Sequence, residues 1–139
     1  MLRVELIYDL DCSNVPAARG ALLRGFAAAG IRPSWAEWDR RSPASPPHAT
    51  RFGSPTILVE GRDVGGTEPA DRADACRVYD HGPDGLRGVP PVARIATALR
   101  DASPFLLGRR RTGRGWWRSL AALPDTGAAL LPVGLCPAC

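Results

Sequence analysis

The chain has 139 residues, 45% of them hydrophobic, and a formal net charge of +4. This length and composition fit one compact domain with an appendage, and they exclude a chain that is disordered overall and a large enzyme. All 18 basic residues are arginines, and the 13 arginines of residues 1–102 balance 13 acidic residues, so the excess positive charge lies in residues 103–139. We therefore expect a neutral domain over residues 1–102 and a basic tail over residues 103–139.

The first elements are a strand and a helix. Residues 3–8 form a short apolar run that predicts a buried strand, and residues 15–29 carry apolar side chains at helical spacing. Ser13 or Asn14 can cap this helix, and Gly30 ends it. The face that we expect to be buried consists of Ala18, Leu22, Leu23, Phe26 and Ala29.

The remaining elements complete a mixed sheet. Residues 34–38 alternate as a second strand, and residues 40–50 contain too much proline for a long helix. Residues 56–64 predict a hairpin around a glycine turn, and residues 91–101 predict a second helix. The predicted order is β-α-β-loop-β-β-α, an α/β domain with a mixed four-stranded sheet. The long irregular stretch of residues 65–90 is uncommon in a compact domain unless it is functional.

The N-terminal segment bears on the compartment. Glu5 and Asp9 stand where a secretory signal peptide needs an unbroken apolar stretch, so we expect a cytoplasmic protein. There, four cysteines are expected to be reduced and to serve catalysis or metal binding, not a framework of structural disulfides.

Cys12 lies between the first predicted strand and the first predicted helix. A helix N-terminus presents unpaired N–H groups and partial positive charge, which stabilise a thiolate and raise its affinity for soft metals. Asp9 and Asp11 oppose this effect because they raise the cost of another negative charge, so we expect a moderately reactive thiol. The alternative is a small buried cysteine without a chemical role.

The segment Ser54-Pro55-Thr56 opens a predicted strand about forty residues after Cys12. Together with the element order, these features resemble the thioredoxin-like superfamily over residues 1–102. The resemblance implies a cis peptide bond before Pro55, packing of Pro55 against Cys12, and a Ser54 backbone able to pair with an extended thiol ligand. Val15 occupies the position of the second cysteine in a Cys-x-x-Cys motif, which disfavours a dithiol disulfide reductase.

Cys76 is the other cysteine of the predicted domain. It is a candidate to resolve a mixed disulfide at Cys12 or to supply a second soft ligand, provided that its loop folds over the site. The alternative is that Cys76, Val78 and Tyr79 are apolar plugs beneath that loop.

The metal chemistry that the sequence suggests is that of sulfur. His48 and His81 lie in predicted loops without metal-ligand spacing to a cysteine, and we expect both to be solvated.

Residues 53–64, followed by residues 76–79 and 86–90, resemble small bacterial thioredoxin-like proteins. Some of these proteins are associated with mercury resistance.

The tail contains arginines, the pair Trp116-Trp117 and then a mostly apolar run. This order is typical of a chain that enters a membrane from the cytoplasmic side. We prefer this interpretation to nucleic-acid binding because the apolar run follows directly and the rest of the chain is neutral. Three prolines and Asp125 interrupt residues 119–139, so this segment cannot span a membrane as it stands.

The end of the tail contains Cys136 and Cys139 in a Cys-x-x-Cys motif. The spacing brings two sulfurs close enough for a disulfide or for a soft cation, whereas a structural zinc site needs four ligands. Residues 130–139 resemble the opening of the first membrane helix of mercuric-transport membrane proteins, so we expect a truncated fusion. The alternative is a disordered end with incidental cysteines.

The leading hypothesis is a thioredoxin-like thiol protein at the inner face of the membrane that binds or transfers a soft metal, Hg(II) or an organomercurial. Cys12 is the expected nucleophile or ligand, Ser54 and Pro55 shape the site, and Cys76 is a second catalytic or ligating thiol. Cys136 and Cys139 would accept the metal by thiolate exchange, with a membrane surface or membrane transporter as the tail's partner. No cofactor is required.

Three alternatives remain open. The first is a glutathione-dependent monothiol oxidoreductase, in which glutathione or another small thiol completes the cycle at Cys12. The second is an organomercurial lyase that uses Cys12 with Cys76 and Asp11, which is disfavoured because the cysteine motifs of that family are not recognisable. The third is a non-catalytic scaffold with an unreactive, fully buried Cys12.

Overall fold

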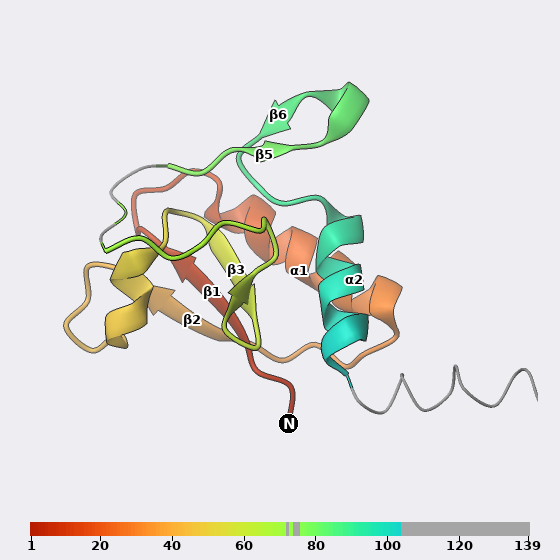
Figure 1. Ribbon diagram of the computed structural model, residues 1–139, viewed down its shortest axis with the longest axis horizontal. Coiled ribbons are helices and arrows are strands. Elements are labelled where there is room, and N and C mark those ends of the chain that lie inside the picture. Colours follow the sequence, from red (N-terminus) through yellow and green to blue (C-terminus); the bar gives the residue numbers. More distant parts are fainter. Residues whose placement is uncertain (72, 74–75, 104–139) are drawn as a thin grey trace, which may run out of the picture.

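A computed structural model describes residues 1–71, 73 and 76–103 as a mixed α/β structure (Figure 1). In chain order the elements are β1 (Val4–Tyr8), α1 (Val15–Ala29), β2 (Ala36–Asp39), the 3₁₀-helix η1 (Pro47–Arg51), β3 (Thr56–Val59), β4 (Arg62–Asp63), β5 (Tyr79–Asp80), the 3₁₀-helix η2 (Gly82–Asp84), β6 (Leu86–Arg87) and α2 (Val92–Ala102). The predicted mixed four-stranded sheet and both predicted helices are confirmed. The expectations for the tail, including Cys136 and Cys139, lie outside the described residues.

The main sheet has the strand order β2-β1-β3-β4. Strand β1 runs parallel to β2 and antiparallel to β3, with Leu6 opposite both Glu37 and Ile57. Strands β3 and β4 are antiparallel and are joined through Glu60 and Gly61, whose φ angles are 50° and 77°. A two-residue hairpin loop favours such left-handed conformations, and glycine adopts them without steric cost, so the predicted glycine turn is confirmed.

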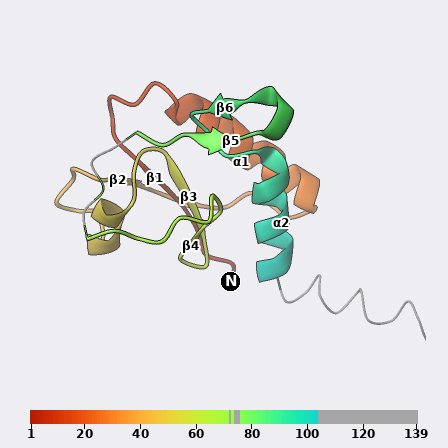
Figure 2. The ribbon, with the colours of Figure 1, turned by 45° about the horizontal axis from the view of Figure 1, so that its top comes forward.

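One face of the sheet packs on both helices. Figures 1 and 2 show α1 and α2 side by side, and their buried side chains form one cluster with residues of β1 and β3. The principal members are Val4, Leu6, Ala18, Leu22, Phe26, Ile57, Val59, Ile95 and Leu99. The sequence-based choice of Leu23 was wrong, because this side chain is 50% exposed on the outer side of α1. The buried stripe instead continues through Val15, Ala21 and Gly25.

The opposite face of the sheet is covered by η1 and the residue that follows it. Ile7 and Leu58 project to this face because side chains alternate along a strand, and they pack with Ala49 and Phe52. Trp38 joins this cluster from β2. Glu5, two residues before Ile7 on β1, is also buried there.

The stretch between β4 and α2 contains a small second sheet, in which β5 pairs with antiparallel β6. It is followed by Gly88, where an added Cβ would overlap the side chain of Asn14. Asn14 stands at the N-cap of α1 but makes no side-chain capping hydrogen bond, so the predicted cap is not formed by this side chain. Gly88 therefore packs against the start of α1, close in the chain to Cys12.

Among the described residues, no helix has the length and apolar character needed to cross a membrane.

The close approach of α1 and α2 depends on Gly25. A Cβ added at this position would lie 2.5 Å from Cγ2 of Ile95, whereas at Gly20 it would meet only the flexible end of Arg24. We expect Gly25→Ala to lower the free energy of unfolding by about 1–2 kcal/mol, because overpacking outweighs the gain in helix propensity. Gly20→Ala is the matched control and should raise it by up to about 1 kcal/mol. Urea unfolding measures both, and equal effects would contradict the assigned helix contact.

Candidate functional site

Cys12 lies in a tight turn between β1 and α1. Its N–H donates to the carbonyl of Asp9 over 3.0 Å, and its own carbonyl accepts from the N–H of Val15 over 3.2 Å. The residue is partly exposed and borders a cavity of about 300 Å³. The lining also includes Tyr8, Leu10, Asp11, Ser13, Val15, Pro16 and Arg19. Cys12 is therefore not the fully buried cysteine expected of a scaffold without chemistry.

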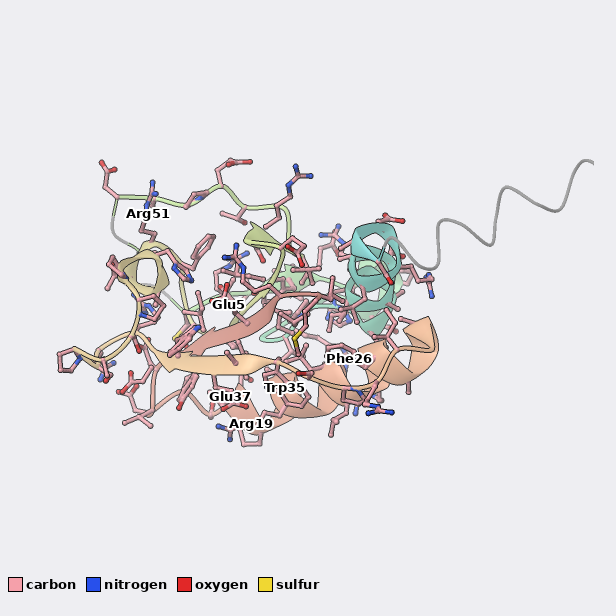
Figure 3. All side chains as sticks on the ribbon, turned by 90° about the horizontal axis from the view of Figure 1, so that it is seen from below. Glu5, Arg19, Phe26, Trp35, Glu37 and Arg51 are labelled. Carbon is pink, nitrogen blue, oxygen red and sulfur yellow. The ribbon has the colours of Figure 1, made fainter. Side chains whose placement is uncertain are left out.

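Arg19, on the wall of this cavity, is paired with Glu37 of β2. The guanidinium donates to both carboxylate oxygens of Glu37, with a shortest distance of 2.6 Å, and Figure 3 shows the two side chains together. This hydrogen bond lowers the pKa of Glu37 and raises the pKa of Arg19. Arg19 also lies over the ring of Tyr8, 5.6 Å from its centroid. The arginine is thus held along the wall by two neighbours.

The two carboxylates near Cys12 are balanced by arginines. Arg40 donates to Asp9 over 2.7 Å, and both side chains are largely buried. Arg41 contacts Asp9 over 3.5 Å and Asp11 over 3.1 Å. The sequence did not predict this pairing of Asp9 and Asp11 with arginines, and the effect of the two carboxylates on the Cys12 thiol stays a prediction.

Ser54 connects the loop before Cys12 to the start of β3. Its buried hydroxyl oxygen accepts a hydrogen bond from the N–H of Asp9 over 2.9 Å. The peptide bond between Ser54 and Pro55 is cis, the isomer that the resemblance implies. Packing of Pro55 against Cys12 stays a prediction.

The backbone of Ser54 pairs with the segment that contains Cys76. Ser54 and Cys76 form a parallel β-bridge, and the Ser54 carbonyl accepts from the N–H of Arg77 over 2.8 Å. An extended external ligand would have to replace this segment to pair with Ser54 in the same way. The two cysteine-bearing segments thus both form hydrogen bonds with one buried serine, one to its hydroxyl and the other to its backbone.

Cys76 is exposed, and Val78 is 64% exposed. The alternative that both are apolar plugs was therefore wrong, whereas Tyr79 is buried as that alternative expected. Alternate residues of an extended segment point to opposite sides, so Arg77 and Tyr79 face the protein while Cys76 and Val78 face outward.

Arg77 and Tyr79 hold this segment on the sheet. Arg77 donates over 2.7 Å to Asp63, whose side chain is fully buried, and over 3.2 Å to the hydroxyl of Thr56. The guanidinium lies 4.9 Å from the ring centroid of Tyr79. The Tyr79 hydroxyl donates to the carbonyl of Pro55 over 2.6 Å, and burial raises the pKa of Tyr79 to about 12.

Neither histidine is simply solvated, which corrects the sequence-based expectation. Nε2 of His48 lies 3.2 Å from Oε1 of Glu5, and Nε2 of His81 lies 2.8 Å from the carbonyl of Val89. Among residues 1–71, 73 and 76–103, no group of three or more His, Cys, Asp or Glu side chains is placed to hold a metal ion. Metal binding at Cys12 would therefore rest on few sulfur ligands.

Sequence reasoning missed the arginines that organise the site. One signal for Arg40 and Arg41 was available, because they follow β2 directly and parallel strands bring their carboxyl ends together at one edge. No comparable signal exists for Arg77, whose partner Asp63 lies in a different hairpin.

Comparisons with protein-family models, curated proteins and solved structures found no match to the chain.

The buried hydroxyl of Tyr79 predicts a pH dependence of stability. Its pKa rises from the ordinary value of about 10 to about 12 in the folded chain, so its contribution is complete below about pH 10 and is lost as the pH rises toward 12. We expect a loss of roughly 2–3 kcal/mol across this range, which Tyr79→Phe should abolish. Urea unfolding of both proteins between pH 9 and about 12 measures the difference, and parallel pH profiles would contradict it.

The Arg77–Asp63 pair predicts a large effect of one substitution. Arg77→Met leaves the buried Asp63 carboxylate without its counter-charge, and we expect the free energy of unfolding to fall by about 3 kcal/mol. Arg87→Met, on exposed β6, is the matched control and should change it by less than about 0.5 kcal/mol. Equal effects in urea unfolding would show that Arg77 does not hold the segment.

Proposed function

We propose that the chain is a thioredoxin-like thiol protein in which Cys12 captures a small, soft electrophile, with Hg(II) or an organomercurial as the leading candidate. The observation that carries this proposal is the double role of Ser54, which contacts the loop before Cys12 and pairs with Cys76. The partial exposure of Cys12 beside a cavity supports access of a ligand to its sulfur.

The size of the ligand follows from the same contacts. The Ser54 backbone is already paired within the chain, so an extended peptide cannot use it unless the Cys76 segment leaves. The cavity of about 300 Å³ beside Cys12 has room for a metal ion with one small thiol ligand. A larger groove of about 770 Å³ lies between the β3–β4 hairpin and α2, and neither Cys12 nor Cys76 lines it.

The proposed reaction is ligand exchange without redox change. A mercuric ion forms a bond to each of two thiolates, and two protons leave when the ligands start as thiols. Cys12 supplies the first sulfur, and Cys76 or a small external thiol supplies the second. Exchange of one sulfur at a time then passes the ion to Cys136 and Cys139, which the sequence places in the tail. We place this transfer on the cytoplasmic side of a membrane.

A glutathione-dependent oxidoreductase at Cys12 is the second candidate. In the monothiol form a second glutathione completes the cycle, and the exposure of Cys76 favours a form in which Cys76 does so instead. In this cycle the Cys12 thiolate attacks glutathione disulfide, forms a mixed disulfide and releases one glutathione thiolate. The thiolate of Cys76 then attacks the Cys12 sulfur, forms an intramolecular disulfide and releases the second glutathione. A Cys12–Cys76 disulfide that reduced glutathione reopens is the product expected from this candidate alone.

The test titrates the reduced full-length protein with mercuric chloride in the presence of glutathione and reads the complexes by native mass spectrometry. Cys136→Ser/Cys139→Ser is the background, so that only Cys12 and Cys76 remain. We expect one Hg(II) per chain. Cys12→Ser should abolish Hg(II) binding to the chain. Cys76→Ser should still bind Hg(II), with one glutathione attached to the ion.

The matched control moves the thiol by one residue, as Cys12→Ser/Ser13→Cys in the same background. It keeps the number of cysteines, so recovery of Hg(II) retention would show that any nearby thiol suffices. Unchanged stoichiometry in Cys12→Ser would overturn the assignment of Cys12 as the capturing thiol.

A further inference from the structure

A second cavity, of about 280 Å³, lies on the sheet face that η1 covers. Its lining comprises Arg3, Glu5, His48, Arg51, Phe52, Gly61 and Pro69. None of these residues borders the cavity beside Cys12. Figure 3 shows Glu5 at β1 and Arg51 at η1, away from Arg19 and Glu37.

Glu5 is a buried acid with one unsatisfied oxygen. The residue is 5% exposed, and its Oε1 accepts from the indole N–H of Trp38 over 2.9 Å and lies 3.2 Å from His48. Its Oε2 is buried and has no hydrogen-bond partner. Nε of Arg3 lies 3.8 Å from Oε2, which is too long for a hydrogen bond. A buried carboxylate oxygen in this state is costly, so the site lacks one donor.

Two arginines line the cavity that Glu5 borders. Arg3 and Arg51 carry guanidinium groups, which match a carboxylate in a two-pronged geometry. Arg51 is oriented by a 3.1 Å hydrogen bond from Nε to the carbonyl of Ala70, and Arg3 lies against Gly61, where a Cβ would be 2.9 Å from its Nη2. Phe52 lines the same cavity as an apolar wall. The cavity thus combines an anion-binding rim, a buried acceptor and an apolar surface.

We propose that this cavity binds a small carboxylate that carries a hydroxyl or ammonium group on its α-carbon. The ligand carboxylate pairs with Arg3 and Arg51, and the α-substituent donates to Oε2 of Glu5. Binding requires the Arg3 side chain, which is 62% exposed, to turn from Glu5 toward the ligand. The apolar remainder of the ligand lies against Phe52. This site is independent of the thiol chemistry of Cys12.

The test uses three probes of three carbons each: L-lactate, L-alanine and propionate, which lacks the donor. Titration of the full-length protein is followed by NMR through the indole N–H resonance of Trp38, assigned with Trp38→Phe. We expect lactate, alanine or both to bind roughly tenfold more tightly than propionate, the effect of one hydrogen bond to a charged group. Glu5→Gln should remove this difference, and Arg51→Gln should weaken every probe that binds.

The controls separate binding from folding. Gln at position 5 still offers Trp38 an acceptor, so the variant should keep the native fold. Arg24→Gln, at an exposed position of α1, and Cys12→Ser should leave the lactate affinity unchanged. Equal affinities for lactate, alanine and propionate, or an unmoved Trp38 resonance, would overturn the proposal and leave a water molecule as the partner of Glu5. Comparison of the three probes on the unsubstituted protein tests the proposal even if a variant fails to fold.

Discussion

The arrangement of the candidate site depends on the hydrogen bonds of one fully buried residue, Ser54. Its hydroxyl receives the N–H of Asp9, three residues before Cys12, and its carbonyl receives the N–H of Arg77, next to Cys76. Water cannot replace these bonds without opening the protein, so each lost bond leaves a buried polar group unsatisfied. Both cysteine segments are therefore positioned by the start of β3.

Buried ion pairs act with Ser54, and each joins segments far apart in the sequence. Arg40 neutralises Asp9 behind the Cys12 loop, and Arg77 neutralises Asp63 beneath the Cys76 segment. The rigid guanidinium fork suits such buried pairing better than an ammonium group. Glu5 differs because one of its oxygens lacks a donor, and this contrast singles out the cavity below η1 as a second site.

Local patterns predicted the regular elements well. The periodicity of residues 15–29 predicted α1 with the bounds that the structure shows, and Gly61 indicated the turn of the β3–β4 hairpin. Leu23 was misplaced because an apolar residue beside a helical stripe can face solvent. The pairing of His48 with Glu5 was missed because these residues are 43 positions apart in the chain and meet only through packing of η1 on the sheet.

The sequence by itself determined the strand–helix junction that carries Cys12, the absence of a second cysteine at Val15, and the strand that follows Pro55. These features depend on residue identity and on short-range spacing, which any reader of the chain can see. Only the tertiary structure decided that Cys76 pairs beside Ser54, that arginines balance Asp9 and Asp11, and that Glu5 is buried with a free oxygen. These features arise from contacts between elements distant in the chain. Local spacing does not show these contacts, apart from the position of Arg40 and Arg41 directly after β2.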